Sequence, residues 1–476
     1  MIKTNSTIIL LIIMGVFLCL YCTVGKSLMT GEYDSKLAQP IEKLIKTNIG
    51  EKLGKHYLEQ LDLWVRQGLL RCSDDRDYLN MMMARVIFGG FAVMLMSFVS
   101  VGLIFIEGTK TGEEQLSKRK MVLILTLIIL NGFFIRLIMA ATFYGNCDMS
   151  WFTVTANNVL AGDNIYTATN HYNYSPMWSL VLAGLKKIQL QFPVVTFGFM
   201  VRFFGCVVDT VSLAFLLLIA KNEGLLATRT AALFYLNPVS FLITGYHGQF
   251  ENFAVLMILI GLWAYLNFRD KAVLGTALLW IFATAGMIVK HNIFYELIIC
   301  LNTAIKRYWL KLLLFAVSVC IFLATFIPYW STGKEGIINN VFKYSSEHYA
   351  IWYGIRSLFN FPPIKYVFIT AVFAFGLFFK DKDIIHNCLM GILFFLAFTT
   401  GIGVQYFVLP IALGAIRPSR EFSLYSLAAS LFLLGNQDNV FIPGFHLLAW
   451  NVVWLSVIYW FALEMKRSRE TGQNIL

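Results

Sequence analysis

Apolar runs of about 17 to 25 residues recur along the chain, and this feature limits the fold more than any other. A run of that length crosses the hydrocarbon core of a bilayer as one helix, because lipid offers no partner for unpaired backbone groups. The composition agrees, since 58% of the 476 residues are hydrophobic and only 14% are charged. These values exclude a soluble enzyme, a disordered protein and a small secreted scaffold. The sequence predicts an all-α, polytopic helical membrane protein.

The basic residues between these runs predict the topology. Clusters of Lys and Arg fall at every second connection, on the same side as Lys3, which the positive-inside rule assigns to the cytoplasm. The formal charge of +11 comes mostly from these clusters, so no nucleic-acid partner is expected. We predict about fourteen transmembrane helices with both termini cytoplasmic, or about two fewer or more if the short runs are re-entrant or half-length helices. The predicted spans are 7–24, 81–106, 121–143, 197–220, 230–246, 253–268, 273–289, 291–305, 310–328, 364–380, 384–400, 404–416, 421–436 and 447–465.

The predicted spans suggest two parts. Residues 1–120 form an N-terminal extension with two transmembrane helices and a small extracytoplasmic helical module, and residues 121–476 form the main transmembrane domain. The stretch 144–196 is too polar to span lipid and is predicted to be a large first outer loop that carries short amphipathic helices, one of which begins at Pro176. Residues 329–363 are predicted to form another outer loop. Cys72 and Cys147 both fall outside the predicted spans on the outer side, so one disulfide is open to them.

Unusual polar residues gather at the outer ends of the predicted spans and in the outer loops. Ionisable groups at membrane depth cost several kcal/mol unless they are paired or line a cavity, which makes them candidates for function. The set comprises Asp148, Asp163, His171, Tyr174, His247, Gln249, Glu251, Lys290, His291, Glu347, His348, Arg356 and Gln405.

Two acidic residues of the first outer loop are candidates for chemistry. Asp148 directly follows a predicted span, where a carboxylate can act as a general base on a hydroxyl, or can simply cap the next helix. Asp163 lies in Gly162-Asp163-Asn164, a sequence that favours a tight turn, and is the candidate for a secondary acid.

The other candidates suit hydroxyl groups and phosphate. The stretch around Tyr174 provides aromatic side chains for sugar stacking or for an interfacial belt, and the hairpin from His247 to Glu251 provides hydrogen-bonding groups or a polar turn. Lys290 and Arg356 are outer cations that can bind a lipid phosphate, although a snorkelling lysine is the simpler interpretation of Lys290.

At these residues the chain resembles the GT-C superfamily of integral-membrane glycosyltransferases, from about residue 121 to 466. The resemblance is closest to the branch with the endoplasmic-reticulum glucosyltransferases of asparagine glycosylation and their prokaryotic mannosyltransferase-like relatives. It is carried by Asp148, the Tyr172-Asn173-Tyr174-Ser175-Pro176 stretch, Met200-Val201-Arg202 with Asp209, Asn237-Pro238, the His247-Gly248-Gln249-Phe250-Glu251 hairpin, Lys290-His291, and Gly403-Val404-Gln405-Tyr406 before Pro410.

The resemblance implies a GT-C-like helical bundle and a role for each matching residue. The catalytic base falls on Asp148, and the contacts to the phosphate of the sugar donor fall on Lys290 and Arg356. Many relatives have an acid pair in the first outer loop, but residue 146 is Asn here, so no cofactor is expected and a divalent metal is not supported. The predicted substrate contacts are Tyr174, His247, Gln249, Glu251, His291, His348 and Gln405.

The resulting hypothesis is an inverting glycosyltransferase that moves a hexose, mannose or glucose, from a polyprenyl- or dolichyl-phosphate donor to a lipid-linked or polymeric glycan. Its active site faces outward, in a prokaryotic plasma membrane or in the endoplasmic reticulum of a eukaryote. A transporter or flippase of lipid-linked sugars is the main alternative, because polar residues at helix breaks also describe substrate pathways. A non-catalytic membrane scaffold is the third interpretation.

Overall fold

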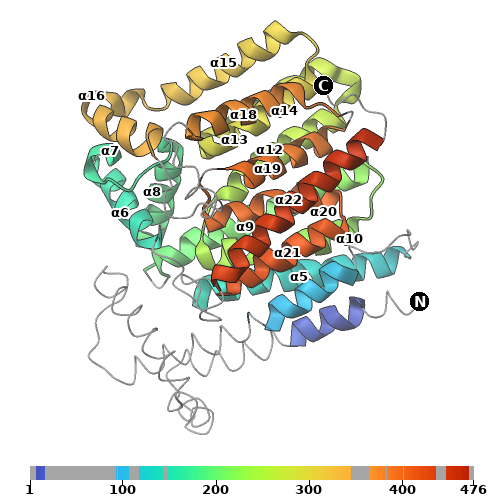
Figure 1. The fold of residues 1–476 in the computed structure, drawn as a ribbon. Helices are drawn as coiled ribbons and strands as arrows, with labels where there is room; N and C mark the ends of the chain where they lie inside the picture. Colours follow the sequence, from blue (N-terminus) through green and yellow to red (C-terminus); the bar gives the residue numbers. More distant parts are fainter. Residues whose placement is uncertain are drawn as a thin grey trace, which may run out of the picture.

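The computed structural model describes residues 7–16, 93, 95–106, 117–142, 148–193, 195–344, 364–381, 383–399, 401–435 and 446–470. Across these residues the chain is helical and contains no strand, which confirms the predicted all-α class (Figure 1). From residue 118 the helices are α5 (Lys118–Thr142), α6 (Asp148–Ala161), α7 (Ile165–Ala168), α8 (Pro176–Gln191), α9 (Phe197–Asn222), α10 (Ala227–Tyr235), α11 (Pro238–Phe241), η1 (Leu242–His247), α12 (Glu251–Asn267), η2 (Arg269–Lys271), α13 (Ala272–Val289), η3 (His291–Ile293), α14 (Phe294–Ala304), α15 (Tyr308–Ala324), α16 (Ile327–Gly336), η4 (Ile337–Phe342), α18 (Ile364–Phe378), α19 (Ile384–Phe398), η5 (Val404–Val408), α20 (Leu409–Ile416), α21 (Arg420–Gly435) and α22 (His446–Glu470).

Some of these helices are long and apolar enough to cross a membrane. Among the described residues they are Lys118–Ala141, Phe197–Asn222 and Arg269–Val289, and the bent pair Tyr308–Ala324 and Ile327–Phe342 makes a fourth if it is one span. Other apolar helices are shorter. At a rise of about 1.5 Å per residue, the 11-residue helix α14 covers only about half of a 30 Å hydrocarbon core. The structure therefore supports a helical bundle with membrane-spanning helices, and it does not confirm about fourteen full-length spans.

Several predicted spans coincide with single helices, but the one at 230–246 does not. The chain breaks after α10, where the Asn237 side chain accepts a hydrogen bond from the Val239 N–H and Pro238 begins α11. Proline has no N–H to continue the hydrogen-bond ladder of α10, which explains the break. Helix α11 then continues as the π-helical turn η1, which ends at His247 and is followed by Gly248 as its C-cap.

The first outer loop forms the predicted set of short helices, α6, α7 and α8. Helix α8 begins at Pro176, as the sequence predicted, because proline is favoured at the first helical position. Helices α6 and α8 pack together, with the Phe152 and Trp178 rings 5.6 Å apart. In Figure 1 these helices and α16 group at one end of the bundle.

Helix α16 occupies part of the segment that was predicted to be an outer loop, 329–363. The chain bends by 77° after α15, and Pro328 lies in the first turn of α16. The Asn164 side-chain amide joins α16 to the first outer loop by donating to the Tyr329 carbonyl at 2.9 Å and to the Thr332 hydroxyl at 2.7 Å. Proline here prevents a continuous helix, so the chain turns and covers α7 instead of continuing away from the bundle.

Ion pairs bring the ends of many helices together at the other end of the bundle. Glu223, after α9, pairs with Arg269 at 2.7 Å and with Arg417 at 3.5 Å, so the ends of α9, α12 and α20 meet there. These basic residues were predicted to share one side, and the contacts confirm that they lie together. The helix Thr7–Val16 of the predicted N-terminal extension contacts α5, since Asn131 donates to the Leu11 carbonyl at 3.1 Å. The predicted module at 25–78, Cys72 and Cys147 lie outside the described residues.

Candidate functional site

Asp148 lies in the first turn of α6, half-buried, and contacts the hairpin that joins η1 to α12. We define this hairpin as residues 245–251. The Gln249 Nε2 donates a hydrogen bond to Asp148 Oδ2 and so holds one carboxylate oxygen. Gly248 makes the turn, with a φ of 66° that glycine adopts without strain. The first outer loop and the hairpin are therefore in contact through Gln249 and Asp148.

The same hairpin holds Lys290. Its Nζ lies 2.6 Å from Glu251 Oε1, and the two side chains are only 3% and 0% exposed. Glu251 is in the first turn of α12, where the helix dipole favours an acid. The Nζ also lies 4.3 Å from the Tyr174 ring centroid and 4.2 Å from that of Phe250, within range of cation–π attraction. Lys290 is thus a caged, paired cation, not a lysine that snorkels to the surface.

Tyr174 is held over Lys290 by hydrogen bonds within the first outer loop. The Tyr166 hydroxyl donates to the Tyr174 carbonyl at 2.8 Å, and Ser175 Oγ donates to the Ile288 carbonyl at 2.5 Å, which ties the loop to α13. Burial raises the pKa of Tyr174 well above its usual range, and the neighbouring carboxylates Asp148 and Glu251 raise it further. The phenol therefore remains protonated, able to donate a hydrogen bond between the two acids.

A buried ion pair holds both ends of the hairpin. Arg136 Nε of α5 lies 2.7 Å from Asp209 Oδ2 of α9, and both side chains are fully buried. Asp209 accepts from Thr244 Oγ1 at 2.9 Å and from Asn252 Nδ2 at 2.5 Å, on either side of the hairpin. Arg136 also donates to the carbonyl of Tyr235, the last residue of α10. This network positions the hairpin, in which Gln249 contacts Asp148 and Glu251 pairs with Lys290.

Unpaired polar atoms accumulate beside Lys290. Buried polar atoms normally have hydrogen-bond partners, and leaving one unpaired costs about 1 to 3 kcal/mol. Asn292 lies near the Tyr406 hydroxyl and Glu296 near the Cys388 thiol, but neither pair reaches hydrogen-bond geometry. Such a cluster indicates groups kept for water or a ligand. The buried atoms without a hydrogen-bond partner among the described residues include Gln249 Oε1, His291 Nδ1, Asn292 Oδ1 and Nδ2, the Tyr295 hydroxyl, and both Glu296 carboxyl oxygens.

The remaining predicted residues vary in their placement. His247 is fully buried in the hairpin, and burial lowers its pKa to about 3, so the ring is neutral at physiological pH. His291 follows Lys290, with its ring 6.1 Å from that of Phe322. Gln405 lies against Gly403, and its neighbour Tyr406 is the residue whose ring approaches Lys290 Nζ, with 6.0 Å to its centroid.

Two predicted residues of the first outer loop, Asp163 and His171, are not joined to the cluster by a contact among the described residues. Asp163 is exposed in the turn between α6 and α7, as its Gly-Asp-Asn sequence suggested, and no contact given by the structure joins it to Lys290 or Asp148. His348 and Arg356 lie outside the described residues, as does Glu347. His171 belongs to the first outer loop, where its ring stacks on Trp151 at 3.5 Å.

Asn292, Tyr295 and Glu296 were not predicted as candidates from the sequence. Glu296 interrupts the apolar run 291–305, and an ionisable residue inside such a run is a recognised sign of function. Tyr406 was noticed only as part of a motif. Asn292 and Tyr295 carry no comparable signal, because polar and aromatic residues are common at helix ends.

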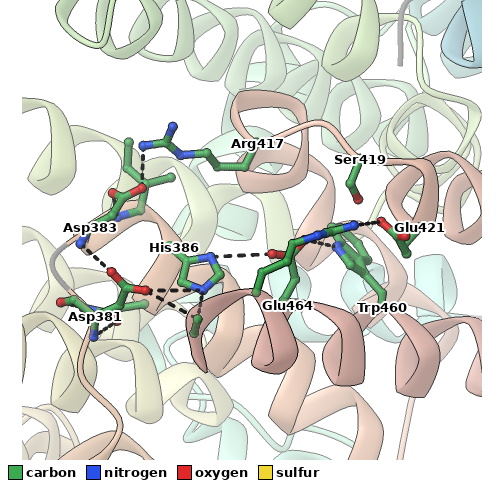
Figure 2. Close-up of polar contacts among 12 residues, drawn as sticks. Asp381, Asp383, His386, Arg417, Ser419, Glu421, Trp460 and Glu464 are labelled. Atoms are coloured by element: carbon green, nitrogen blue, oxygen red, sulfur yellow. Dashed lines mark hydrogen bonds and ion pairs between the residues drawn. The ribbon is translucent and has the colours of Figure 1, made fainter. Parts of the chain in front are cut away.

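A second polar cluster lies at the opposite end of the bundle, and there the carboxylates are paired. Figure 2 shows His386 between Asp381 and Glu464, with separations of 3.8 and 3.9 Å. Arg467 pairs with Glu464 at 2.5 Å and with Glu421 at 2.9 Å. These contacts join α19, α21 and α22, and they are typical of an ion-pair network that stabilises helix packing. Because the unpaired polar atoms lie beside Lys290 and the carboxylates at the opposite end are paired, the candidate site is the one around Lys290.

Comparisons with known proteins do not assign the chain to a family. No protein-family model, curated protein or solved structure matches this chain. No group of three His, Cys, Asp or Glu side chains suited to a metal ion is found in the described part of the chain. The candidate site therefore comprises the half-exposed Asp148, the caged Lys290–Glu251 pair, and the unpaired groups from His291 to Glu296.

Proposed function

We propose that this protein is an inverting membrane glycosyltransferase that takes a hexose, mannose or glucose, from a polyprenyl-phosphate-linked donor. The observation that carries the proposal is the position of Asp148. Its carboxylate is half-buried and oriented by Gln249, beside a buried cation and a set of unpaired hydrogen-bonding groups. A carboxylate, a cation and aromatic rings are the groups that a hydroxyl nucleophile, a phosphate leaving group and a sugar ring require.

In the proposed reaction, Asp148 accepts the proton of an acceptor hydroxyl as its oxygen attacks the anomeric carbon. A bond forms from that oxygen to the anomeric carbon, and the bond from the anomeric carbon to the phosphate oxygen breaks. The electron pair leaves with the lipid phosphate, and attack from the opposite face inverts the configuration. The products are a glycosylated acceptor, a lipid monophosphate and a proton on Asp148, so charge and atoms balance.

We assign the phosphate contact to Lys290, which is paired with Glu251 of the hairpin. It stabilises charge that develops on the departing phosphate, which lowers the barrier only if the interaction is stronger in the transition state. Its pairing with Glu251 limits its attraction for a bound phosphate before reaction. Arg356 is proposed as a second phosphate contact from the outer loop that precedes α18.

The proposed setting is a membrane-embedded bundle of about fourteen spans with both termini in the cytoplasm. The site then faces the extracytoplasmic side, where a lipid-linked or polymeric glycan acceptor can approach the half-exposed Asp148. The resemblance to GT-C enzymes supports this arrangement. A prokaryotic plasma membrane is the proposed location, or the endoplasmic reticulum of a eukaryote.

A transporter or flippase of lipid-linked sugars is the second candidate. It is favoured by the helix break at Asn237-Pro238 and by a buried ion pair at a helix end, since transporters use broken helices and buried charges at their substrate sites. A transporter moves its substrate without breaking a bond, so the two candidates differ in whether free lipid phosphate is formed.

The test is an incubation of purified protein in detergent with radiolabelled polyprenyl-phosphate mannose, glucose and arabinose, each with a crude lipid-linked glycan acceptor. The expected result is release of free polyprenyl phosphate from mannose or glucose donor, in proportion to label transferred to the acceptor, with and without EDTA. Binding of a donor without release of lipid phosphate, in folded protein, would favour the transporter.

A further inference from the structure

The start of α14 has three neighbouring side chains with unsatisfied hydrogen-bonding capacity. Both amide atoms of Asn292, the Tyr295 hydroxyl and both Glu296 oxygens are buried without a partner in the described part of the chain. Tyr295 and Glu296 are only 1% and 2% exposed. Five orphaned atoms within one helical turn are too many to be incidental, since each costs about 1 to 3 kcal/mol.

Tyr406 connects these groups to Lys290. Asn292 lies near the Tyr406 hydroxyl, and Lys290 Nζ lies 6.0 Å from the Tyr406 ring centroid. The rings of Tyr295 and Tyr406 both pack on Phe395, at centroid distances of 4.9 and 5.8 Å. The groups at the start of α14 therefore continue the Lys290 site inward.

The unpaired atoms have the chemistry of a hydroxyl-binding surface. The Asn292 amide both donates and accepts, the phenol does the same, and a carboxyl group accepts from hydroxyls. Aromatic rings beside them provide an apolar surface for the C–H face of a ring. A phosphate or a lipid tail offers no row of hydroxyls to match these groups, whereas a sugar ring does.

The covalent structure of the donor also places the sugar next to the phosphate. A sugar attached to a phosphate is one bond away from it, so a sugar subsite must adjoin the phosphate contact. Asn292 is two residues from Lys290 in the 3₁₀ turn η3 that leads into α14. Resting on the proposed function, we propose that Asn292, Tyr295 and Glu296 form the subsite that binds the hydroxyls of the donor sugar and so select its identity.

The experiment compares two probes, polyprenyl phosphate and polyprenyl-phosphate mannose or glucose, by measuring their dissociation constants in detergent. Wild-type protein is expected to bind the sugar-bearing lipid about tenfold more tightly than the bare lipid, which corresponds to about 1.4 kcal/mol. Asn292→Leu is expected to abolish this difference while binding of bare polyprenyl phosphate stays within twofold, which also shows that the variant is folded.

Glu296 provides the second pair of variants. Glu296→Gln keeps hydrogen-bonding atoms in place and is expected to retain at least part of the sugar preference, whereas Glu296→Leu loses it. If Asn292→Leu does not fold, this pair decides. An unchanged sugar preference in both leucine variants would overturn the subsite and assign the unpaired atoms to buried water.

The outcomes separate this inference from the proposed function. If wild-type protein binds neither lipid, the proposed function fails with the subsite. If it binds bare polyprenyl phosphate and gains nothing from the sugar, the subsite alone is wrong.

Discussion

At the scale of a single residue, the contacts of Lys290 show a role that its position in the sequence did not predict. Its place at the outer end of a predicted span suggested either snorkelling or a phosphate contact. The structure adds Glu251 at 2.6 Å and the rings of Tyr174 and Phe250 around it. The ion pair with Glu251 offsets the desolvation cost of burying the Lys290 ammonium. The candidate site and the stability of the fold therefore depend on the same ion pair.

This dependence can be measured. Lys290→Met leaves Glu251 as an uncompensated buried carboxylate and is expected to reduce the free energy of unfolding in detergent by about 3 to 5 kcal/mol. The double variant Lys290→Met/Glu251→Gln should recover at least half of that loss. Lys334→Met is the control, because Lys334 also lies over a ring, that of Trp330, but is exposed. Equal losses for Lys290→Met and Lys334→Met would contradict a buried ion pair on which the fold depends.

His247 supplies a pH-dependent prediction. Its pKa is lowered by burial from 6.5 to about 3, so between these values the unfolded chain binds a proton that the folded protein does not. Stability contributed at this residue is therefore present above pH 6.5 and is lost as the pH falls. From pH 6.5 to 5.0 the loss is about 2 kcal/mol.

Thermal unfolding in detergent at pH 7.5 and 5.0 checks this effect. Other groups also titrate in this range, so the comparison is between wild type and His247→Gln. The variant is expected to lose less stability than wild type on acidification. The same pH dependence in both proteins would show that His247 is not the source.

At the scale of elements, the hairpin is the part on which the site depends. It begins where Pro238 prevents α10 from continuing, turns at Gly248, and is fastened by Asp209 through Thr244 and Asn252. A methyl group added at Gly248 would lie 2.7 Å from Met149 Cε and 2.9 Å from Arg202 Cγ. The turn therefore needs glycine for its positive φ and for space.

Gly248→Ala and Gly224→Ala form a matched pair. Both glycines have positive φ, 66° and 67°, but nothing lies within 4 Å of a Cβ at Gly224. Gly224→Ala is expected to cost about 1 kcal/mol of stability, from backbone strain alone, and to keep wild-type sugar transfer. Gly248→Ala is expected to cost more and to reduce transfer at least tenfold, because Gln249 moves away from Asp148. Equal transfer rates in the two variants would mean that the hairpin position does not matter.

The sequence predicted some elements well and others poorly, for identifiable reasons. Helix α8 was predicted because Pro176 marks its start and an apolar pattern follows. The division of 230–246 into α10, α11 and η1 was missed, although Asn237-Pro238 was visible, because hydropathy averages over such breaks. Helix α16 was missed because its position depends on Asn164, far away in the chain.

The candidate site was predicted in part. Asp148, Gln249, Glu251, Lys290 and Tyr174 were chosen one by one, and the structure brings them together. Which of them pair could not be predicted, since an ion pair between α12 and α13 depends on the packing of both helices. Unpaired atoms such as those of Asn292 can be recognised only once every possible partner has a position.

At the scale of the whole molecule, the bundle has two chemically different ends. The end near α6, α8 and Lys290 keeps unpaired polar atoms, whereas at the opposite end the carboxylates of Glu223, Glu421 and Asp383 are paired with arginines. Substrate is expected to bind where polar groups such as Asn292 and Glu296 lack partners, not where the carboxylates are paired.

The difference between the two ends of the bundle predicts that they face opposite sides of the membrane. Asp163→Cys in the turn after α6 and Arg469→Cys near the end of α22 place thiols at exposed positions. In intact cells a membrane-impermeant maleimide is expected to label Asp163→Cys above the wild-type background and to label Arg469→Cys only after permeabilisation. Labelling of both from outside would contradict a site that faces the extracytoplasmic side.

The proposed role of Asp148 as the base of a sugar transfer can be tested with one substitution. Asp148→Asn preserves the shape of the side chain and removes its ability to accept a proton, so transfer from the active polyprenyl-phosphate sugar should fall by at least about 100-fold. Binding of that donor should remain within a few fold. Asp163→Asn, which changes an exposed acid of the same loop, should leave the rate unchanged. Transfer by Asp148→Asn at the wild-type rate would contradict the account.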